Sequence, residues 1–251
     1  MSGRDIVVAL QSVDAGYPGR KVLEELTFDI CRGEIFILLG GSGCGKSTVM
    51  KHMIGLNPVL GGRLTVLGSE WSHRTRPQLC RRIGVMYQSG ALFGSMTCIE
   101  NVMLPMELAG SMPARVRRER AMERLREVEL ADAAEKFPRE LSGGMRKRVA
   151  IARALALDPE IVFLDEPGAG LDPITAASLD RLILALREAK GTTFVIVTHE
   201  LASILRIGDR AAVFDRQRRT LVALGNPREL KSGAKDAFVH RFFNAEEQYD
   251  G

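Results

Sequence analysis

The sequence predicts an α/β domain with a largely parallel sheet, because short apolar runs alternate with helical patterns along the chain. The run "EIFILLG" (34–40) is followed by a helical pattern that closes at Asn57-Pro58. Two further apolar runs, "EIVFLDEP" (160–167) and "TTFVIVTHE" (192–200), flank a helical stretch from Ile174 to Ala189. The segment Cys98–Leu157 breaks this alternation, since it is almost wholly helical in pattern, and it indicates a helical insertion.

The remaining elements follow from the same patterns. Further strands are expected at "RLTVLG" (63–68) and "RIGVMYQ" (82–88). Near the end of the chain, "RAAVFDRQRRTLVALG" (210–225) predicts a hairpin, and "DAFVHRFF" (236–243) predicts an amphipathic helix.

Composition narrows the possible class of protein. With 45% apolar and 26% charged residues in 251, the chain has the balance of an ordinary globular fold. No apolar run approaches the roughly 18 residues of a membrane span, and the N-terminus lacks a secretory signal, so we expect a cytoplasmic location. Cys31, Cys44, Cys80 and Cys98 show no metal-ligand spacing and are expected to be reduced thiols.

The charge of +4 permits a nucleic-acid or anionic-membrane partner without requiring either. The arginine-rich run 114–130 has acids interleaved at helical spacing, as in Arg115–Glu119, Arg120–Glu123 and Arg126–Glu129. This pattern favours a solvated helix face, and we expect no nucleic-acid partner.

The segment "GGSGCGKST" (40–48), called the phosphate loop below, fits G-x-x-x-x-G-K-[ST] between a strand and a helix. Its backbone N–H groups are expected to face phosphate oxygens. Lys46 would neutralise phosphate charge and Ser47 would ligate Mg²⁺. Cys44 lies near a positive helix end that could lower its pKa, although a small tolerated residue is the more common interpretation. The candidate nucleotide contacts are Gly40, Gly41, Ser42, Gly43, Cys44, Gly45, Lys46, Ser47 and Thr48.

Two carboxylates stand at the end of the apolar strand "IVFLD" (161–165). Ligands bind at the carboxyl ends of strands in α/β sheets, so Asp165 is a candidate Mg²⁺ ligand, through water. Glu166 is the candidate general base for the water that attacks the γ-phosphate. His199 ends another apolar strand and could reach the same phosphate, although a lone histidine there is usually structural.

The stretch "LSGGMRKRVAIARAL" (141–155) places glycines immediately before a helix, where backbone N–H groups and Ser142 can face a second anion. Together with the phosphate loop, this stretch resembles the ATP-binding-cassette (ABC) ATPases, and the resemblance covers nearly the whole chain. "GGSGCGKST" is similar to the Walker A motif, "IVFLDE" to Walker B, and "LSGGM" to the signature motif. Gln88 resembles the Q-loop glutamine, Asp172 in "GLD" the D-loop aspartate, His199 the switch histidine, and Tyr17 the adenine-stacking aromatic.

The resemblance implies a P-loop NTPase (RecA-like) core with a β-subdomain and an inserted α-helical subdomain. The core and β-subdomain would occupy 1–97 and 158–225, the helical subdomain 98–157, and a helical tail 226–251. It also implies a head-to-tail dimer of two copies. Mg-ATP would lie between Lys46, Asp165 and Glu166 of one copy and Ser142, Gly143 and Gly144 of the other. The family's usual signature ends in glutamine where this chain has Met145, and we expect function to survive because the serine and backbone amides contact the anion.

The resemblance assigns the stretch "YQSGALFGSM" (87–96) a double role. The Q-loop glutamine, Gln88, would sense Mg²⁺, and Leu92, Phe93 and Met96 would form a groove for an integral membrane permease. Seven of the ten methionines fall between Met86 and Met145, which suits a docking surface because methionine adapts to irregular partners. For Met103, Met106 and Met122 a place in the core of the helical insertion is the better expectation.

"QSGALF", "LSGGMRKRVAIARALALDPEIVFLDEP", "GLDPITA" and the tail "FVHRFFNAE" together resemble the ATPases of MCE (mammalian cell entry), Mla-type lipid transport systems. This resemblance implies phospholipid transport between envelope membranes, an MCE-domain partner protein, and a location on the cytoplasmic face of the inner membrane through the permease. The alternatives are an ATPase of a small-solute importer, such as one for amino acids, and a soluble ABC protein outside transport. The single cassette without coiled-coil heptads disfavours the last.

Overall fold

The computed structural model describes residues 5–110, 112–233 and 235–244. It contains two compact units. The first unit comprises residues 1–76 and 195–251, and the second unit comprises 77–194. This division differs from the expected boundaries at 97/98 and 157/158, which remain a prediction. The last seven residues of the predicted tail lie outside the described residues.

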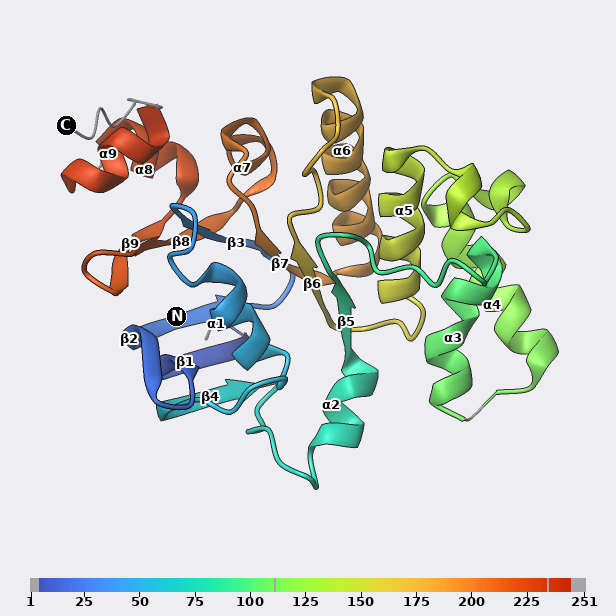
Figure 1. Ribbon diagram of the computed structural model, residues 1–251, viewed down its shortest axis with the longest axis horizontal. Coiled ribbons are helices and arrows are strands. Elements are labelled where there is room, and N and C mark those ends of the chain that lie inside the picture. The colour runs from blue at the N-terminus through green and yellow to red at the C-terminus, as the bar shows by residue number, and fades with distance from the viewer. Residues whose placement is uncertain (1–4, 111, 234, 245–251) are drawn as a thin grey trace. The chain divides into compact units, whose positions relative to one another are not determined.

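The first unit holds an antiparallel sheet in the order β2-β1-β4 and a second set of strands in the order β3-β8-β9 (Figure 1). In the second set, β3 runs parallel to β8, and β8 pairs antiparallel with β9. Its elements are β1 (Ile6–Tyr17), β2 (Arg20–Cys31), β3 (Ile35–Gly40), α1 (Lys46–Met53), β4 (Gly61–Val66), α7 (Leu201–Ile207), β8 (Arg210–Asp215), β9 (Thr220–Gly225), α8 (Pro227–Gly233) and α9 (Ala237–Asn244).

The core of the first unit centres on β3, in which every residue is buried. Phe36 of β3 stacks on Phe28 of β2 with ring centroids 5.5 Å apart, so the two sets of strands share this apolar contact. The continuous apolar run of β3 is explained by this burial on both faces. Because β3 is fixed by its packing, the phosphate loop that follows it leaves from a rigid strand end.

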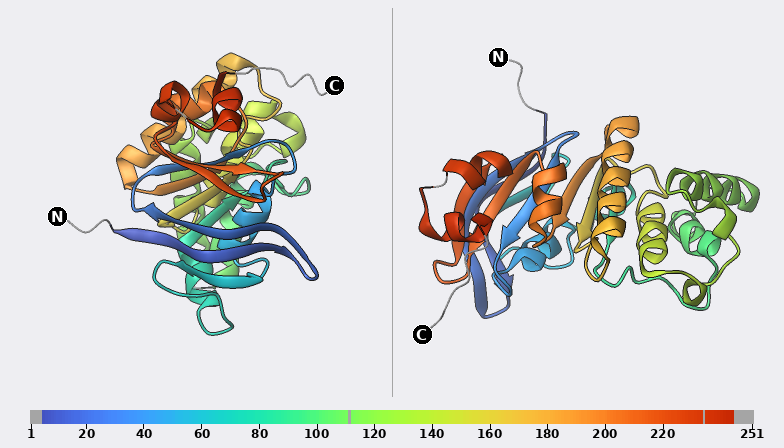
Figure 2. Two further views of the ribbon diagram at one scale, coloured as in Figure 1. Left: turned by 90° about the vertical axis from the view of Figure 1, so that its left-hand side faces the viewer. Right: turned by 90° about the horizontal axis from the view of Figure 1, so that it is seen from above.

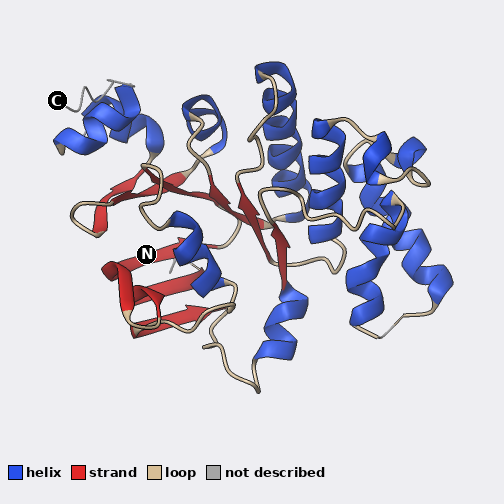
Figure 3. Cartoon of the chain, in the orientation of Figure 1, coloured by secondary structure: helices blue, strands red, loops and turns tan. Residues whose placement is uncertain are grey.

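The second unit is mainly helical, as Figure 3 shows by colour. Its parallel strands β5 and β6 pair from Ile83–Ile161 to Met86–Leu164, and α5 packs against β5, α3 and α4. Its elements are β5 (Ile83–Met86), α3 (Cys98–Leu108), α4 (Ala114–Glu127), short 3₁₀ turns at Ala131–Ala133 and Pro138–Glu140, α5 (Gly143–Ala154), β6 (Ile161–Asp165) and α6 (Pro173–Lys190). Two elements, α2 (Arg76–Arg82) and β7 (Thr193–Val197), cross the boundary between the units.

The elements expected from sequence patterns are present. The segment 98–157 is helical, α6 lies where Ile174–Ala189 was expected, and the C-terminal hairpin is β8–β9. The amphipathic helix predicted at 236–243 is α9, which lies beside α8 in both views of Figure 2. Within 5–110, 112–233 and 235–244, no helix is long and apolar enough to cross a membrane.

Candidate functional site

The phosphate loop begins at the buried end of β3 and turns sharply into α1. Gly40 and Gly45 have φ angles of 142° and 110°, a region that side chains with a Cβ rarely adopt. A Cβ on Gly40 would lie 2.4 Å from the Phe214 carbonyl oxygen, and one on Gly45 would lie 2.9 Å from Val22 Cγ1. Both the backbone conformation and the close packing therefore require glycine at positions 40 and 45.

Lys46, the first residue of α1, is 9% exposed and folds back under the loop. Its Nζ donates to the carbonyl oxygens of Gly40 at 2.8 Å and Gly41 at 3.1 Å. A Cβ added at Gly41 would meet nothing within 4 Å, so the space above this part of the loop is open. An open loop of backbone amides with an ammonium at its base fits a polyphosphate. Ser47 lies in the first turn of α1, where the P-loop serine holds Mg²⁺.

Cys44 lies in the phosphate loop with its thiol buried. Its side chain is 1% exposed, and Sγ would lie 2.6 Å from a Cβ on Gly40, so the thiol fills the space beside that glycine. Burial raises the pKa of the Cys44 thiol above its ordinary value, and this outweighs the opposing effect of the Lys46 charge. Of the two interpretations of Cys44, the small packing residue is therefore favoured over a thiol activated by the helix end.

His52 is a buried residue that the sequence analysis did not identify. Its Nε2 accepts a hydrogen bond from the Gly16 N–H at 2.9 Å, so the ring is neutral, and Nδ1 donates to the Asn57 carbonyl oxygen at 3.1 Å. Burial lowers the pKa of His52 below its ordinary value. The histidine ties α1 to the end of β1, immediately before Tyr17. Its spacing on the buried face of α1 was the only available signal.

Tyr17 and His199 occupy exposed positions in the first unit. Tyr17 ends β1, is 42% exposed, and pairs with Arg20 across the β1–β2 turn. That turn and the phosphate loop line one cavity of about 460 Å³, with Arg20, Gly43 and Cys44 in its wall. His199 follows β7 and precedes α7. These positions leave both assignments as predictions.

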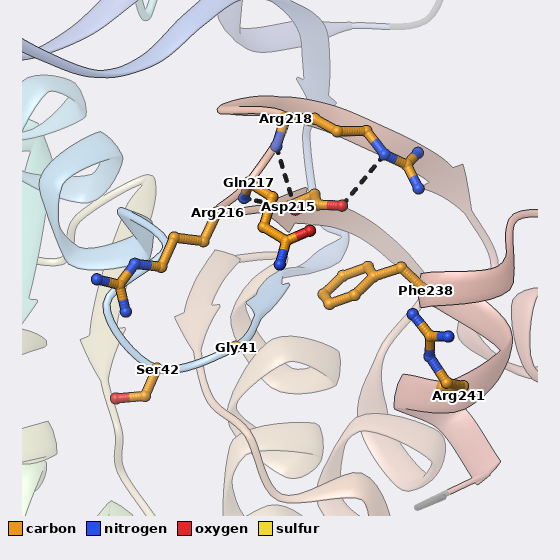
Figure 4. A pocket seen from close by; sticks show the side chains of 8 residues that line it. All are labelled: Gly41, Ser42, Asp215, Arg216, Gln217, Arg218, Phe238 and Arg241. Atoms are coloured by element: carbon orange, nitrogen blue, oxygen red, sulfur yellow. Dashed lines mark hydrogen bonds and ion pairs between the residues drawn. The ribbon is translucent and has the colours of Figure 1, made fainter. Parts of the chain in front are cut away.

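A second cavity, of about 330 Å³, borders Gly41 and Ser42 of the phosphate loop (Figure 4). Gly41 and Ser42 form one wall, the β8–β9 turn another, and Phe238 and Arg241 of α9 project into it. Asp215 shapes the turn, because its carboxylate accepts from the Gln217 N–H at 2.7 Å and pairs with Arg218 Nε at 3.2 Å. Arg216, Arg218 and Arg241 line this cavity beside the loop, and Arg218 is paired with Asp215 and Asp236.

In the second unit, Asp165 and Glu166 leave the end of β6 as the sequence predicts. Glu166 is 9% exposed and has a φ of 49°, in the left-handed region that side chains other than glycine adopt at a cost of about 1–3 kcal/mol. Its carbonyl oxygen accepts from the Ala169 N–H at 3.2 Å, which closes the turn. Burial, and secondarily the Asp165 charge, raise the pKa of Tyr87 at the end of β5, so the 87–96 stretch begins close to these carboxylates.

The 87–96 stretch, called the Q-loop segment below, is fastened to α5 and α3. The Gln88 carbonyl accepts from Lys147 Nζ at 2.5 Å, and the Gly90 and Ala91 carbonyls each accept from Arg153 at 2.7 Å. The Gln88 side chain is exposed, as a ligand-sensing residue requires.

Asn101 of α3 holds the other end of the Q-loop segment, and the sequence analysis missed it. It is fully buried, accepts from the Phe93 N–H at 2.8 Å, and donates to the carbonyls of Phe93, Met96 and Thr97 at 3.0–3.1 Å. A polar residue within the apolar pattern "CIENVMLPM" was the available signal. The α3 start was also readable, because Thr97 and Glu100 form a capping box.

The candidate docking residues follow from this arrangement. Phe93 is 50% exposed although its backbone is fixed, while Leu92 and Met96 are half-buried. Of the three methionines expected in the core, Met106 is fully buried, and Met103 and Met122 are half-buried.

The signature segment Ser142–Met145 forms the start of α5. Ser142 is the N-cap, and its hydroxyl accepts from the Met145 N–H at 3.3 Å. Gly144 lies close to α6, since a Cβ there would stand 2.6 Å from Thr175 Cγ2. Asp172 caps α6 by accepting from the Ile174 and Thr175 N–H groups at 3.0 Å, and hydrogen bonds from Thr175 lower the pKa of its carboxyl. The signature and the D-loop aspartate therefore cap neighbouring helices.

The arginine-rich α4 has the solvated face that the sequence predicts. Arg115 pairs with Glu119 at 2.8 Å between two exposed side chains. The expected pairing of Glu129 with Arg126 is replaced by one with Arg148 of α5 at 2.5 Å, because α4 ends at Glu127 and Glu129 leaves the helix with a φ of 61°.

Comparison with known proteins places the chain in a family. The family model described as "ABC transporter" matches residues 23–169. The probable ribonucleotide transport ATP-binding protein mkl of Mycobacterium leprae is 36% identical over 242 residues, covering 95% of this chain and 69% of that protein. The methionine import ATP-binding protein MetN of Carboxydothermus hydrogenoformans is 38% identical over 218 residues, covering 84% of this chain and 64% of that protein.

A solved structure extends the likeness to the fold. The ATP-binding cassette MJ0796, a dimer in a post-hydrolysis state with ADP and Pi bound, matches with a TM-score of 0.77 and 31% identity. The match covers 88% of this chain and 99% of that one. The α/β fold with its mixed sheet is therefore that of an ABC-type ATPase.

Proposed function

Because the chain belongs to the ABC transporter ATP-binding family, whose members hydrolyse ATP with Mg²⁺, we propose that it powers an MCE/Mla-type phospholipid transport system. The observation that carries the transport role is the Q-loop segment, which presents Phe93 half-exposed on a backbone fixed by Asn101. A rigid loop with an exposed aromatic side chain is typical of a docking site. Both named relatives are transport ATP-binding proteins, which supports this role.

The residue roles in hydrolysis follow the motifs. Tyr17 would stack on adenine, while the amides of Gly41 to Thr48 and the Lys46 ammonium would bind the phosphates. Ser47, Gln88 and Asp165 would hold Mg²⁺, which supplies charge neutralisation at the β- and γ-phosphates. Glu166 would accept a proton from the attacking water, and its burial holds the carboxylate in one place. His199 would contact the γ-phosphate.

A second copy of the chain would complete each site with Ser142, Gly143, Gly144 and Asp172. The exposed Ser142 at the start of α5 leaves a helix N-terminus open to an anion, which supports this role. The dimeric cassette with ADP and Pi is a precedent for such an assembly.

The permease would dock on Leu92, Phe93 and Met96, beside Gln88. Through that permease the protein would sit on the cytoplasmic face of the inner membrane, together with an MCE-domain protein. The lipid specificity is supported by the stretches "QSGALF", "LSGGMRKRVAIARALALDPEIVFLDEP" and "GLDPITA". A small-solute importer is the second candidate, because one relative is named as a methionine import protein.

The transport role is tested by purifying the tagged protein with its native membrane partners and identifying co-purifying proteins and lipids by mass spectrometry. A permease with an MCE-domain protein and phospholipid supports the proposal. A solute permease with a solute-binding protein supports the second candidate. Recovery without any permease contradicts both.

The docking surface is tested in the same preparation with Phe93→Asp. Leu108→Asp is the matched control, because Leu108 is also an exposed apolar residue of the second unit, at 79% exposure. We expect Phe93→Asp to lose the permease while Leu108→Asp retains it. Equal retention would move the docking surface elsewhere.

The assignment of the base is tested by Glu166→Gln. Loss of a general base lowers the rate by roughly 10²–10⁴-fold, whereas ATP binding and ATP-dependent dimerisation should persist. The readouts are phosphate release, nucleotide binding and mass by light scattering. An unchanged hydrolysis rate excludes Glu166 as the base.

A further inference from the structure

Lys147 occupies a position in α5 that the motifs do not account for. It lies five residues after Ser142, in the second turn of the helix, and is 8% exposed. A buried ammonium is costly unless its donors are used by hydrogen-bond acceptors. Two acceptors of the Lys147 ammonium are backbone carbonyls of segments that carry site residues, so this side chain connects those segments.

Lys147 Nζ donates to the Gln88 carbonyl at 2.5 Å and to the Glu166 carbonyl at 3.2 Å. These residues are 78 positions apart in the sequence, yet one side chain reaches both. An ammonium has three donors, so it can serve both carbonyls together. Lys147 therefore joins the signature helix, the Q-loop segment and the turn after β6 within the second unit.

The turn at Glu166 is the part that needs support. Its left-handed backbone, with φ of 49°, is a conformation that persists only where neighbours hold it. Its carbonyl accepts from the Ala169 N–H and from Lys147 Nζ, each at 3.2 Å. Removing Lys147 would take away a charged donor that orients the peptide following the Glu166 side chain.

The Q-loop segment is held by α5 in a similar way further along. Ala91 also has a left-handed backbone, with φ of 47°, and its carbonyl accepts from Arg153. Gly90 packs against α5, since a Cβ there would lie 3.4 Å from Ala150 Cβ. A shift of the Q-loop segment would thus act on α5, and through Lys147 on the Glu166 turn.

We propose that Lys147 is a positioning residue for ATP hydrolysis, which holds the Glu166 turn in place relative to the Q-loop segment. The proposal rests on the proposed roles of Glu166 and Gln88. It assigns Lys147 no contact with ATP. The expected defect is in the rate of the chemical step, with nucleotide binding spared.

The experiment compares Lys147→Met and Lys147→Arg in the full-length protein with Mg-ATP. Methionine keeps the length of the side chain without the donors, and arginine restores donors. We expect Lys147→Met to lower kcat about 10- to 100-fold, the scale of a small misplacement of a catalytic group, with KM for ATP unchanged within about twofold. Lys147→Arg should recover a measurable part of kcat.

Arg148→Met is the matched control. Arg148 is the next residue of α5 and donates to the Val128 carbonyl and to Ser178 Oγ, away from Gln88 and Glu166. Arg148 is half-buried and also pairs with Glu129 at 2.5 Å, so Arg148→Met removes several partly buried bonds. It should lower the melting temperature at least as much as Lys147→Met while leaving kcat within about twofold. Hydrogen exchange in segments 88–91 and 166–169 should rise in Lys147→Met and stay unchanged in Arg148→Met.

Three results would each overturn the proposal. They are an equal kcat in Lys147→Met and Arg148→Met, a defect of Lys147→Met confined to KM, and unchanged exchange at both segments in Lys147→Met. If Lys147→Met does not fold, Lys147→Arg, which keeps the charge but moves the donors, decides the question. A kcat below that of the unmodified protein with faster exchange at 88–91 and 166–169 supports the proposal, whereas an unchanged kcat with unchanged exchange contradicts it. The Glu166→Gln variant separates the two levels of inference. A normal hydrolysis rate in Glu166→Gln refutes the assignment of Glu166 as the base. A lowered rate in Glu166→Gln together with a normal rate in Lys147→Met refutes only the positioning role of Lys147.

Discussion

The phosphate loop and the signature segment are both glycine-rich starts of helices, but they are built in different ways. The phosphate loop has left-handed glycines, a buried lysine and a wall from β2 that contacts Gly45. The signature segment starts with an exposed serine N-cap, and Gly143 and Gly144 are not among the residues with positive φ. The first loop is thus shaped by its own chain, whereas the second is an ordinary helix start, which under the proposed function would meet its ligand only through a partner copy.

The largest expected effect comes from adding a methyl group to each segment. In Gly45→Ala the new Cβ would lie 2.9 Å from Val22 Cγ1, and the alanine backbone would have to keep a φ of 110°. Together these should cost roughly 2–4 kcal/mol of unfolding free energy. In Gly143→Ala the nearest atom is Leu171 Cδ2 at 3.5 Å, an ordinary contact, so stability should change by less than about 1 kcal/mol. Chemical denaturation measures both. Similar losses of unfolding free energy in Gly45→Ala and Gly143→Ala would contradict the difference proposed between the phosphate loop and the signature segment.

The next effect concerns ATP binding. Lys46→Ala removes a charged donor from the phosphate loop and should weaken ATP binding to the monomer about 10- to 100-fold. Ser142→Ala removes the N-cap of α5, costs about 1 kcal/mol of stability, and should leave monomer binding unchanged while reducing ATP-dependent dimerisation. Calorimetry of the dilute protein and light scattering separate the two outcomes. A loss of monomer binding in Ser142→Ala would mean that the signature contacts ATP within one chain.

A smaller effect is expected from pH. The pKa of His52 is lowered in the folded protein, so the unfolded chain binds the proton more readily and stability falls as pH drops below about 6.5. The pKa of Asp172 is also lowered, but from an ordinary value of 3.8. The contribution of Asp172 to the stability of the fold is therefore complete above pH 3.8 and is lost only as the pH falls below that value. As the pH is lowered from 7.5 to 5.5, the protection factor of the Gly16 amide, which corrects for the intrinsic pH dependence of exchange, should therefore fall, while the protection factors at the start of α6 stay unchanged.

His73→Gln is the control for this pH effect, because His73 is exposed in the same unit. The stability of His73→Gln should depend on pH as it does in the unmodified protein, whereas the stability of His52→Gln should change little between pH 7.5 and 5.5. A retained pH dependence in His52→Gln would assign the effect to another group.

The smallest effect is the reactivity of the loop thiol. Burial and the raised pKa should make Cys44 react with iodoacetamide far more slowly than the exposed Cys80. Mass spectrometry after a short labelling pulse identifies the modified cysteine. Rapid labelling of Cys44 would show that the phosphate loop opens in solution.

Most of the elements and the candidate motif residues were accessible from the sequence. Local patterns predicted β3, β6, α6 and the helical segment 98–157, because burial on both faces or on one stripe leaves a readable apolar period. The phosphate loop and the Asp165–Glu166 pair were predicted from motif spacing together with the apolar strands that precede them. Lys147, His52 and Asn101 were not, because each bonds backbone groups whose identity depends on the fold.

The sequence by itself determined the order of strands and helices and the residue types offered to phosphate and Mg²⁺, since both depend on local spacing. The tertiary structure decided the state of Cys44, where burial outweighs the nearby positive charge. It also decided the partner of Glu129 and the joint hold of Lys147 on Gln88 and Glu166. The physical reason is common to all three. Desolvation and hydrogen bonding are set by neighbours in space, which a linear pattern does not specify.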